Sequence, residues 1–201
     1  MYVHTMKQIA AIFIVILGHI VLAPQLIAYR LSNQKSSIKA DCMQSMNRRS
    51  VSLQGYTMVI YILMVDPFYR KMFYHRLGWW SLIFSWYFPG DKTFNPLCDE
   101  IGGGIYLAHP TSTYLNAKKI GKNLTCRQNT TIGNKYEDGK ISCPTIGDNV
   151  NVGANVCIIG DITIGNNVTI GAGSVVVKSI PDNCVAVGNP VRIIEFHRNN
   201  E

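Results

Sequence analysis

Between residues 146 and 180 the sequence repeats one pattern every six residues. An aliphatic residue opens each repeat, glycine follows it in four repeats of six, and a second apolar or small residue comes four positions after the first. The opening residues are Ile146, Val152, Ile158, Ile164, Ile170 and Val176, and the second residues are Val150, Val156, Ile162, Val168, Ser174 and Ile180. A half-buried strand alternates with a period of two and a helix with a period of about 3.6, so neither element alone explains the pattern.

A fixed six-residue period is typical of a solenoid in which three short strands form each turn. Each aliphatic residue points inward and stacks on its equivalent about eighteen residues further on, while Gly, Asn and Asp take the tight corners. The same spacing occurs earlier, at Ile101 and Leu107 and at Ile120, Cys126 and Ile132. One extra residue interrupts it near 113–119, and eight extra residues interrupt it within 134–145. We therefore predict a mainly β fold, a left-handed parallel β-helix over 96–180 in a domain of residues 96–201, with a loop projecting at 134–145.

The first 95 residues differ in charge from the rest of the chain. They hold ten Lys and Arg against three Asp, a net charge of +7, whereas residues 96–201 hold nine basic and nine acidic residues. This asymmetry indicates an anionic partner for the first half. All three tryptophans and long apolar runs lie in the same half, so a membrane surface fits it better than nucleic acid does. We expect residues 1–95 to form an apolar, basic, α-helical region that associates with a membrane, and we expect no nucleic-acid partner.

Residues 8–29 contain no formally charged side chain and, as one helix, would extend about 33 Å, close to the thickness of a bilayer core. Three interpretations are open: a single membrane helix or membrane-embedded hairpin, a helix buried in a packed subdomain, and a secretory signal. His19, Pro24 and Gln25 weaken the first, and Pro24 directly after the apparent cleavage site weakens the third. Residues 66–90 mix aromatics with Arg and Lys, which is typical either of an interfacial element or of packing against the next domain.

The cysteines and histidines exclude several kinds of site. The cysteines are Cys42, Cys98, Cys126, Cys143, Cys157 and Cys184. No two of them have the C-x-x-C spacing of a zinc ribbon or a thioredoxin motif, and their sparse spacing does not indicate a disulfide framework. We therefore expect six reduced thiols that act as small core residues. His109 is the only histidine between residues 76 and 196, so a zinc site with three histidine ligands is excluded there, and we expect no metal.

Several stretches of the repeat region resemble a known family. The strings IGGGIYLAH, RQNTTIG, IGDNVNVGANVCIIGDITIGNNVTIGAGSVVVKSIPDN and VGNPVRII are similar to the hexapeptide-repeat acyltransferases, and most of all to their serine O-acetyltransferase branch. This resemblance covers roughly residues 94–195. The segment DPFYRKMFYHRLG is similar to the one that precedes the β-helix in polysaccharide-cluster members of that branch. The resemblance implies a homotrimer that uses acetyl-CoA as acyl donor, held in the groove between neighbouring subunits.

The resemblance also implies roles for single residues. His109 matches the general base of the family, and an imidazole that titrates near neutral pH can remove the proton of an alcohol as it attacks a thioester. Backbone N–H groups would stabilise the oxyanion. The positions that match the coenzyme A site are Gly133, Asn134, Ala154, Ala172, Gly173 and Lys178. We assign Ala108, Gln128 and Cys143 to the acceptor site, which the loop at 134–145 would help to cover.

Departures from the family pattern bear on the acceptor. Serine acetyltransferases carry Asp directly before the catalytic His and Arg-His before the Pro of the loop, whereas this chain has Ala108 and Ser142-Cys143. The two charges of serine cannot be buried without counter-charges. We therefore expect the acceptor to be a sugar hydroxyl of an envelope or capsular polysaccharide precursor. L-Serine O-acetylation for cysteine biosynthesis, sugar N-acetylation and a non-catalytic trimeric scaffold are the alternatives.

The family's Asp that orients the His is also missing, since Lys92, Thr93 and Phe94 occupy the positions around it. Asp91, Asp99 or a backbone carbonyl are the candidates to replace it. Because acetyl-CoA is a cytosolic metabolite, we expect the β-helix to be cytoplasmic and the N-terminal region to associate with the inner membrane.

Overall fold

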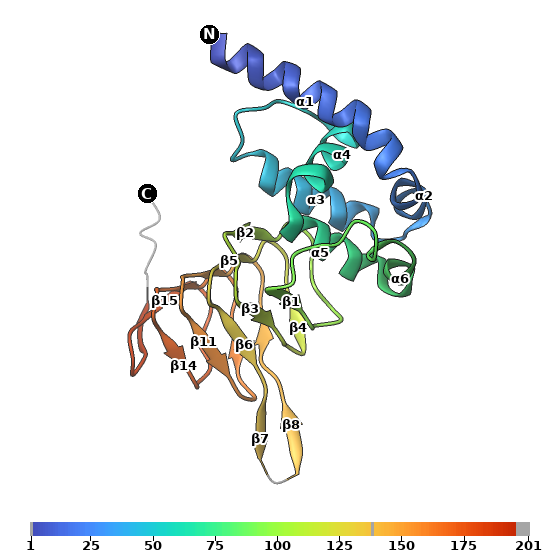
Figure 1. The fold of residues 1–201 in the computed structure, drawn as a ribbon. Helices are drawn as coiled ribbons and strands as arrows, with labels where there is room; N and C mark the ends of the chain where they lie inside the picture. The colour runs from blue at the N-terminus through green and yellow to red at the C-terminus, as the bar shows by residue number, and fades with distance from the viewer. Residues whose placement is uncertain (1, 138, 196–201) are drawn as a thin grey trace. The chain divides into compact units, whose positions relative to one another are not determined.

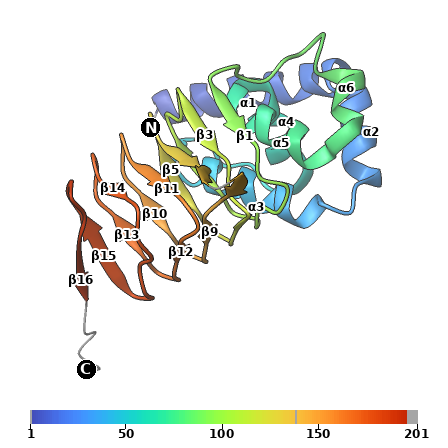
Figure 2. The ribbon, with the colours of Figure 1, turned by 90° about the horizontal axis from the view of Figure 1, so that it is seen from below.

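The hexad repeats fold into a left-handed parallel β-helix (Figures 1 and 2). The structure is a computed structural model that describes residues 2–137 and 139–195, and the chain divides into two units, residues 1–92 and 93–201. The β-helix is the second unit, and its first strand begins at Phe94, two residues before the boundary expected from the sequence. Its regular coils confirm the predicted fold class.

Three parallel sheets form the sides of the coil. Sheet A contains β1 (Phe94–Pro96), β3 (Thr113–Leu115), β6 (Thr131–Gly133), β11 (Cys157–Ile159) and β14 (Val175–Val176). Sheet B contains β4 (Lys119–Ile120), β9 (Thr145–Ile146) and β12 (Thr163–Ile164). Sheet C contains β2 (Tyr106–Ala108), β5 (Thr125–Arg127), β10 (Asn151–Val152), β13 (Thr169–Ile170), β15 (Cys184–Val187) and β16 (Arg192–Glu195). Only β16 is antiparallel in sheet C, where it covers β15 at the last coil.

The hexad residues fill the interior of the prism. All six opening residues from Ile146 to Val176 are at most 1% exposed, and the parallel register places equivalents opposite one another, as Ile158 lies opposite Ile132 and Val176. At the corner between sheets B and C the backbone takes positive φ at successive asparagines, whose side-chain amides bond from coil to coil. These are Asn123, Asn149, Asn167 and Asn183, with Nδ2–Oδ1 distances of 2.9–3.1 Å. Apolar stacking and amide ladders therefore both follow the repeat.

The irregularity expected near 113–119 lies elsewhere. Leu115, not Thr113, occupies the inward position of β3, because it lies opposite Ile132 of β6. The spacing from Leu107 to Leu115 is consequently eight residues, and the spacing from Leu115 to Ile120 is five. Compared with the regular spacing of six residues, the first coil has two extra residues directly after β2 and lacks one residue after β3. The extra residues therefore begin at His109.

The eight extra residues within 134–145 form a projecting β-hairpin, as the sequence predicts. Its strands are β7 (Lys135–Glu137) and β8 (Lys140–Ser142), which pair antiparallel and extend away from the coil (Figure 1). Tyr136 and Ile141 lie opposite each other on it and are 70% and 69% exposed.

The first unit is entirely helical. Its elements are α1 (Tyr2–Val21), α2 (Ala23–Leu31), α3 (Lys35–Met46), α4 (Gly55–Val65), α5 (Pro67–Leu77), the 3-10 helix η1 (Gly78–Trp80) and α6 (Ser81–Phe84). Helix α1 packs along α4 at Gly18, where a Cβ would collide with Ile60. Ala11, Val15 and Leu22 are buried on this side.

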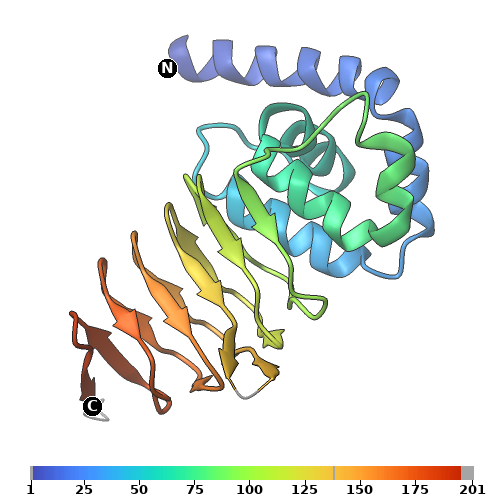
Figure 3. The ribbon, with the colours of Figure 1, turned by 60° about the horizontal axis from the view of Figure 1, so that its bottom comes forward.

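The uncharged stretch 8–29 is not one helix. Pro24 lies in the first turn of α2, since a proline inside a continuous helix would lack the donor for its hydrogen bond and would clash with the preceding turn. Among the described residues no single helix is long and apolar enough to cross a membrane. Thr5–Val21 and Ala23–Leu31 together are long and apolar enough to do so, but the two helices are bent by 80° relative to each other. The bend is visible where the two blue helices meet in Figure 3. A single membrane helix over residues 8–29 is therefore excluded, whereas the membrane-embedded hairpin and the packed helix both remain predictions.

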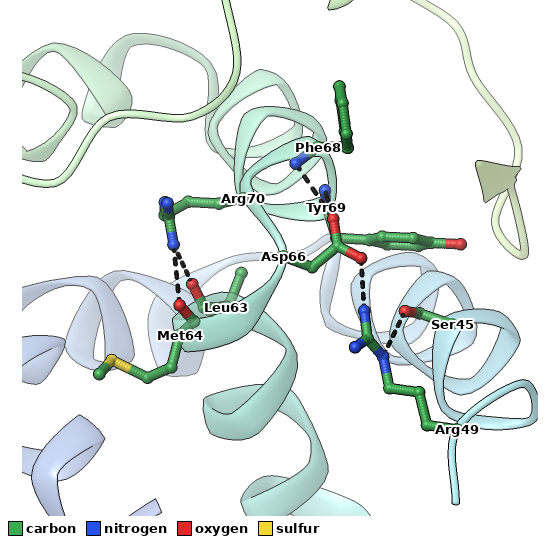
Figure 4. A network of polar contacts seen from close by, with 8 residues as sticks. All are labelled: Ser45, Arg49, Leu63, Met64, Asp66, Phe68, Tyr69 and Arg70. Carbon is green, nitrogen blue, oxygen red and sulfur yellow. Dashed lines mark hydrogen bonds and ion pairs between the residues drawn. The ribbon is translucent and has the colours of Figure 1, made fainter. Parts of the chain in front are cut away.

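Ion pairs hold the helices of this unit together. Asp66 caps α5, accepting hydrogen bonds from the backbone N–H groups of Phe68 and Tyr69 at 3.1 and 3.2 Å, and it also accepts one from Arg49 at 2.6 Å (Figure 4). Arg76 of α5 binds Asp41 of α3 through two hydrogen bonds of 2.6 and 3.1 Å. Two of the three acidic residues of this unit are thus neutralised inside it.

Candidate active site

His109 lies at the corner where the chain passes from sheet C to sheet A. It directly follows β2, its backbone has a φ of 54°, and its side chain is exposed. Leu107 and Pro110 on either side of it are buried, so the turn is fixed to the coil while the imidazole faces outward. The sequence alone placed His109 in the first coil but not on a particular corner.

The two-residue insertion explains why this corner differs from those below it. In later coils each turn between sheets C and A has one residue with positive φ, namely Asn129, Asn155 or Gly173. The equivalent residue in the first coil is Ser112, with a φ of 51°. The hydrogen bonds between coils show this equivalence: Asn129 N donates to Thr111 O, the residue before Ser112, and Asn155 N donates to Gln128 O, the residue before Asn129. His109 and Pro110 are therefore additional. The wider turn is held by the bond from Thr111 N to His109 O, 2.7 Å long.

Six of the residues assigned from the sequence lie along this one edge of the prism, which we call the His109 edge. They are Ala108, His109, Gln128, Ala154, Ala172 and Gly173. Backbone bonds connect the successive corners, from Asn155 N to Gln128 O at 3.0 Å and from Gly173 N to Ala154 O at 2.9 Å. A Cβ built on Gly173 would meet no atom within 4 Å, so this part of the edge is open. An extended ligand could lie against the backbone here.

The other four assigned residues lie on the edge between sheets A and B, which we call the hairpin edge. Gly133 ends β6 and Asn134 follows it, Cys143 follows β8, and Lys178 lies two residues after β14. Asn116, which the sequence did not single out, connects them: its amide donates to Asn134 Oδ1 at 3.1 Å, and its Oδ1 is 3.9 Å from Cys143 Sγ. Within one chain, the width of sheet A separates this edge from His109.

Arg127 is a second residue that the sequence reading missed. The register of β2 and β5 places it opposite Ala108, on the outer face of sheet C beside the His109 edge. Its Nη1 donates to Asn151 Oδ1 at 2.8 Å and to Val152 O at 3.2 Å. The guanidinium is therefore held toward β10, one coil further from Ala108, on the same outer face of sheet C. Only the register of neighbouring coils could have revealed this relationship.

No hydrogen bond or ion pair to the His109 imidazole is found among residues 2–137 and 139–195. Asp99, one of the candidates for orienting it, lies between β1 and the bridge of Ile101 to Ile120. That position is on the hairpin edge and not on the His109 edge. Asp91, the other carboxylate candidate, belongs to the helical unit.

Comparison with known proteins agrees with this geometry. Residues 143–178 match the family described as bacterial transferase hexapeptide (six repeats). WcaB of Escherichia coli (strain K12), named as a colanic acid biosynthesis acetyltransferase, is 47% identical over 94 residues, which are 46% of this chain and 57% of the relative. Serine acetyltransferase 3 of Arabidopsis thaliana is 43% identical over 96 residues, 47% of this chain and 25% of the relative. The chain thus spans about half of WcaB and less of the plant protein.

Solved structures extend the likeness beyond the aligned sequences. Soybean serine acetyltransferase superimposes with a TM-score of 0.62 at 29% identity, covering 79% of this chain and 68% of that one. The Neisseria gonorrhoeae serine acetyltransferase in complex with serine gives 0.63 at 26% identity, covering 85% and 73%. The resemblance seen in the sequence is therefore confirmed: the β-helix is similar to that of the hexapeptide-repeat acyltransferases, in particular of the serine acetyltransferase-like branch.

Proposed function

We propose that this protein transfers the acetyl group of acetyl-CoA to a hydroxyl group, with His109 as the general base. The observation that carries the proposal is the exposed imidazole on an inserted, left-handed turn at the head of an open edge. His109 takes the proton of the acceptor hydroxyl while the oxygen attacks the thioester carbonyl. A new C–O bond forms, the C–S bond breaks, and the imidazolium returns the proton to the departing thiolate.

The small residues of the His109 edge suit an extended acyl donor. The methyl groups of Ala154 and Ala172 and the missing side chain of Gly173 leave room for a pantetheine-like chain to approach the backbone of the stacked corners. Lys178 is exposed on the hairpin edge and suits a phosphate. Since the two edges are apart within one chain, a single subunit offers these groups on separate surfaces.

A homotrimer would bring the two edges together. In such an assembly the His109 edge of one subunit faces the hairpin edge of its neighbour, so that His109, Cys143 and Lys178 border one groove. The division of the assigned residues between two edges supports this arrangement. Sedimentation velocity on the full chain tests it, and a monomer that turns over acetyl-CoA at full rate would contradict it.

We propose a sugar hydroxyl of an envelope or capsular polysaccharide precursor as the acceptor. Ala108 and Cys143 offer no charges to a serine zwitterion, and the relative WcaB is named for colanic acid biosynthesis. Arg127, which lies opposite Ala108 in the strand register, suits an acceptor that carries phosphate, as sugar nucleotides and lipid-linked glycans do. The reaction uses a cytosolic donor, so we place the β-helix in the cytoplasm.

L-Serine is the second candidate, favoured by the likeness to serine acetyltransferases, one of them in complex with serine. A thioester-release assay with acetyl-CoA separates the candidates when L-serine, uridine-diphosphate sugars and lipid-linked oligosaccharides are compared as acceptors. Release with glycans alone supports the proposal. Faster release with L-serine replaces it, and no release with any hydroxyl acceptor points to a non-catalytic scaffold.

A further inference from the structure

Helix α1 lies at the outside of the helical unit (Figures 1 and 3), and the side chains on its outer side are apolar. Seven of its side chains are between 45% and 76% exposed: Met6, Ile9, Ile12, Phe13, Ile16, Leu17 and Ile20. On α2, which follows α1 after a bend of 80°, Ile27 and Leu31 are 61% and 74% exposed. We call these nine residues the α1–α2 face. A patch of this size on one side of a folded unit indicates a binding surface.

A second exposed apolar cluster belongs to the same unit. Trp79, Leu82 and Trp86, on and just after η1 and α6, are 64%, 77% and 79% exposed. The Tyr87 hydroxyl lies 2.9 Å from Val21 O and 2.7 Å from Gln25 Oε1, which fixes this aromatic segment to the bend between α1 and α2. Gln25 itself is fully buried. The aromatic segment and the α1–α2 face are therefore parts of one rigid structure.

The charges around these surfaces are positive. Asp41 and Asp66 are neutralised by Arg76 and Arg49, which leaves one of the three acidic side chains of residues 1–92 outside these ion pairs. Exposed cations of the unit include Lys7 on α1, Arg30 on α2, and Lys35 and Lys39 on α3. Exposed apolar residues bordered by cations and tryptophans are typical of segments that lie at an anionic lipid surface.

We infer that the α1–α2 face and the aromatic segment bind in the plane of an anionic lipid bilayer, without crossing it. The aliphatic side chains enter the boundary between headgroups and acyl chains, the indoles lie at the headgroup level, and the cations face phosphate. The opposite side of α1 packs on α4, an 11-residue helix of about 16 Å that cannot span a bilayer. An in-plane position also keeps the ion pairs Arg49–Asp66 and Arg76–Asp41 out of hydrocarbon.

A second copy of the chain is the rival occupant of this surface. Two such faces would bring like charges together, whereas an anionic bilayer complements them, so lipid is favoured. The inference goes beyond the proposed acetyl transfer and does not depend on it, because it concerns residues outside the β-helix. It would place the enzyme at the surface where lipid-linked acceptors are held.

Intrinsic fluorescence tests the inference directly, because all three tryptophans of the chain lie in the aromatic segment. The full chain is mixed with vesicles of phosphatidylcholine alone or with about 30% phosphatidylglycerol. We expect a blue shift and co-flotation only with the anionic vesicles, weakening as salt rises. Lipids brominated near the headgroup should quench more strongly than lipids brominated near the chain end. Equal or deeper quenching would overturn the in-plane position.

Matched variants separate this surface from the rest of the protein. Phe13→Glu combined with Ile20→Glu should reduce vesicle binding about tenfold or more, while Leu97→Glu, an equally apolar and exposed change on the β-helix, should not. Circular dichroism verifies folding, and thioester release is measured in parallel. Loss of vesicle binding with unchanged soluble activity supports the inference. The inference is overturned if the wild-type chain does not bind anionic vesicles. It is also overturned if the wild-type chain forms larger oligomers that the double variant abolishes. Neither result bears on the proposed acetyl transfer.

Discussion

Ala108 and Arg127 lie opposite each other in the parallel register of β2 and β5, and Asn151 Oδ1 and Val152 O of β10 hold the Arg127 guanidinium on the next coil. Ala108 and Arg127 are both on the outer face of sheet C at the head of the His109 edge. A cation on this face binds an anionic acceptor more strongly than a neutral one.

We therefore expect Arg127→Gln to raise the KM of a phosphate-bearing sugar acceptor about tenfold, the equivalent of about 1.4 kcal/mol, with kcat changed much less. The KM of a neutral sugar should stay within a factor of about two. Lys122→Gln, at a corner between sheets B and C, is the control. If both acceptors lose activity equally, Arg127 has only a structural role through Asn151 and Val152.

His109→Asn should lower kcat by about 10²–10⁴-fold, the usual contribution of a general base. Asparagine is the replacement of choice because it tolerates the left-handed conformation that His109 adopts and that asparagine adopts at other corners. The melting temperature should therefore stay unchanged. Ser112→Asn alters a neighbouring residue of similar backbone conformation and should retain activity. More than about a tenth of the activity remaining in His109→Asn would rule out the base role.

L-Serine should be a poor acceptor, with kcat/KM lower than that of the best glycan by about two orders of magnitude or more. Each uncompensated charge costs several kcal/mol on entering the site, and each 1.4 kcal/mol is about tenfold. Steady-state kinetics with saturating acetyl-CoA measure both acceptors. A KM for serine in the low millimolar range or below, with comparable kcat, would contradict the assignment of Ala108 and Cys143.

Cys143 should react with iodoacetamide in the native protein, whereas Cys42 and Cys126 should react only after unfolding. Burial raises the pKa of the Cys126 thiol to about 12 and raises that of Cys42 as well, so neither forms an appreciable thiolate at pH 8. Cys143 is half-buried beside the hairpin. Peptide mass spectrometry after timed labelling identifies the sites. Labelling of Cys126 as fast as Cys143 would show that the first coils open in solution.

Asp41→Ala should lower the free energy of unfolding by about 3–5 kcal/mol, because it leaves the Arg76 guanidinium charged and uncompensated in the interior. The two side chains are 5% and 3% exposed. Urea unfolding followed by circular dichroism measures the change. Glu100→Ala, which removes the exposed partner of Lys119, is the control and should have no measurable effect. Equal effects of the two substitutions would show that burial does not decide the energetics here.

The local sequence determined the β-helix, the position of the hairpin and the identity of His109. A hexad repeat records contacts between equivalent residues of successive coils, so each repeat specifies its own strand and corner without distant information. The hexad pattern alone therefore assigned the opening residues from Ile146 to Val176 to the interior, where they lie. The break in the first coil could not be placed in this way, since Thr113 and Leu115 are both buried and either satisfies the pattern.

Only the tertiary structure decided which corner each site residue occupies. His109 and Pro110 lie on an inserted turn at the edge that also carries Gln128, Ala154 and Gly173, whereas Asn134 and Cys143 lie on the hairpin edge. The opposition of Ala108 and Arg127 likewise depends on residues 19 positions apart in the chain. For residues 8–29, hydrophobicity alone does not distinguish a buried side from an exposed one. The buried side of α1 is the side that packs on α4, and the bend at Pro24 ends the helix before it could extend further. That packing depends on contacts between helices that are distant in the sequence.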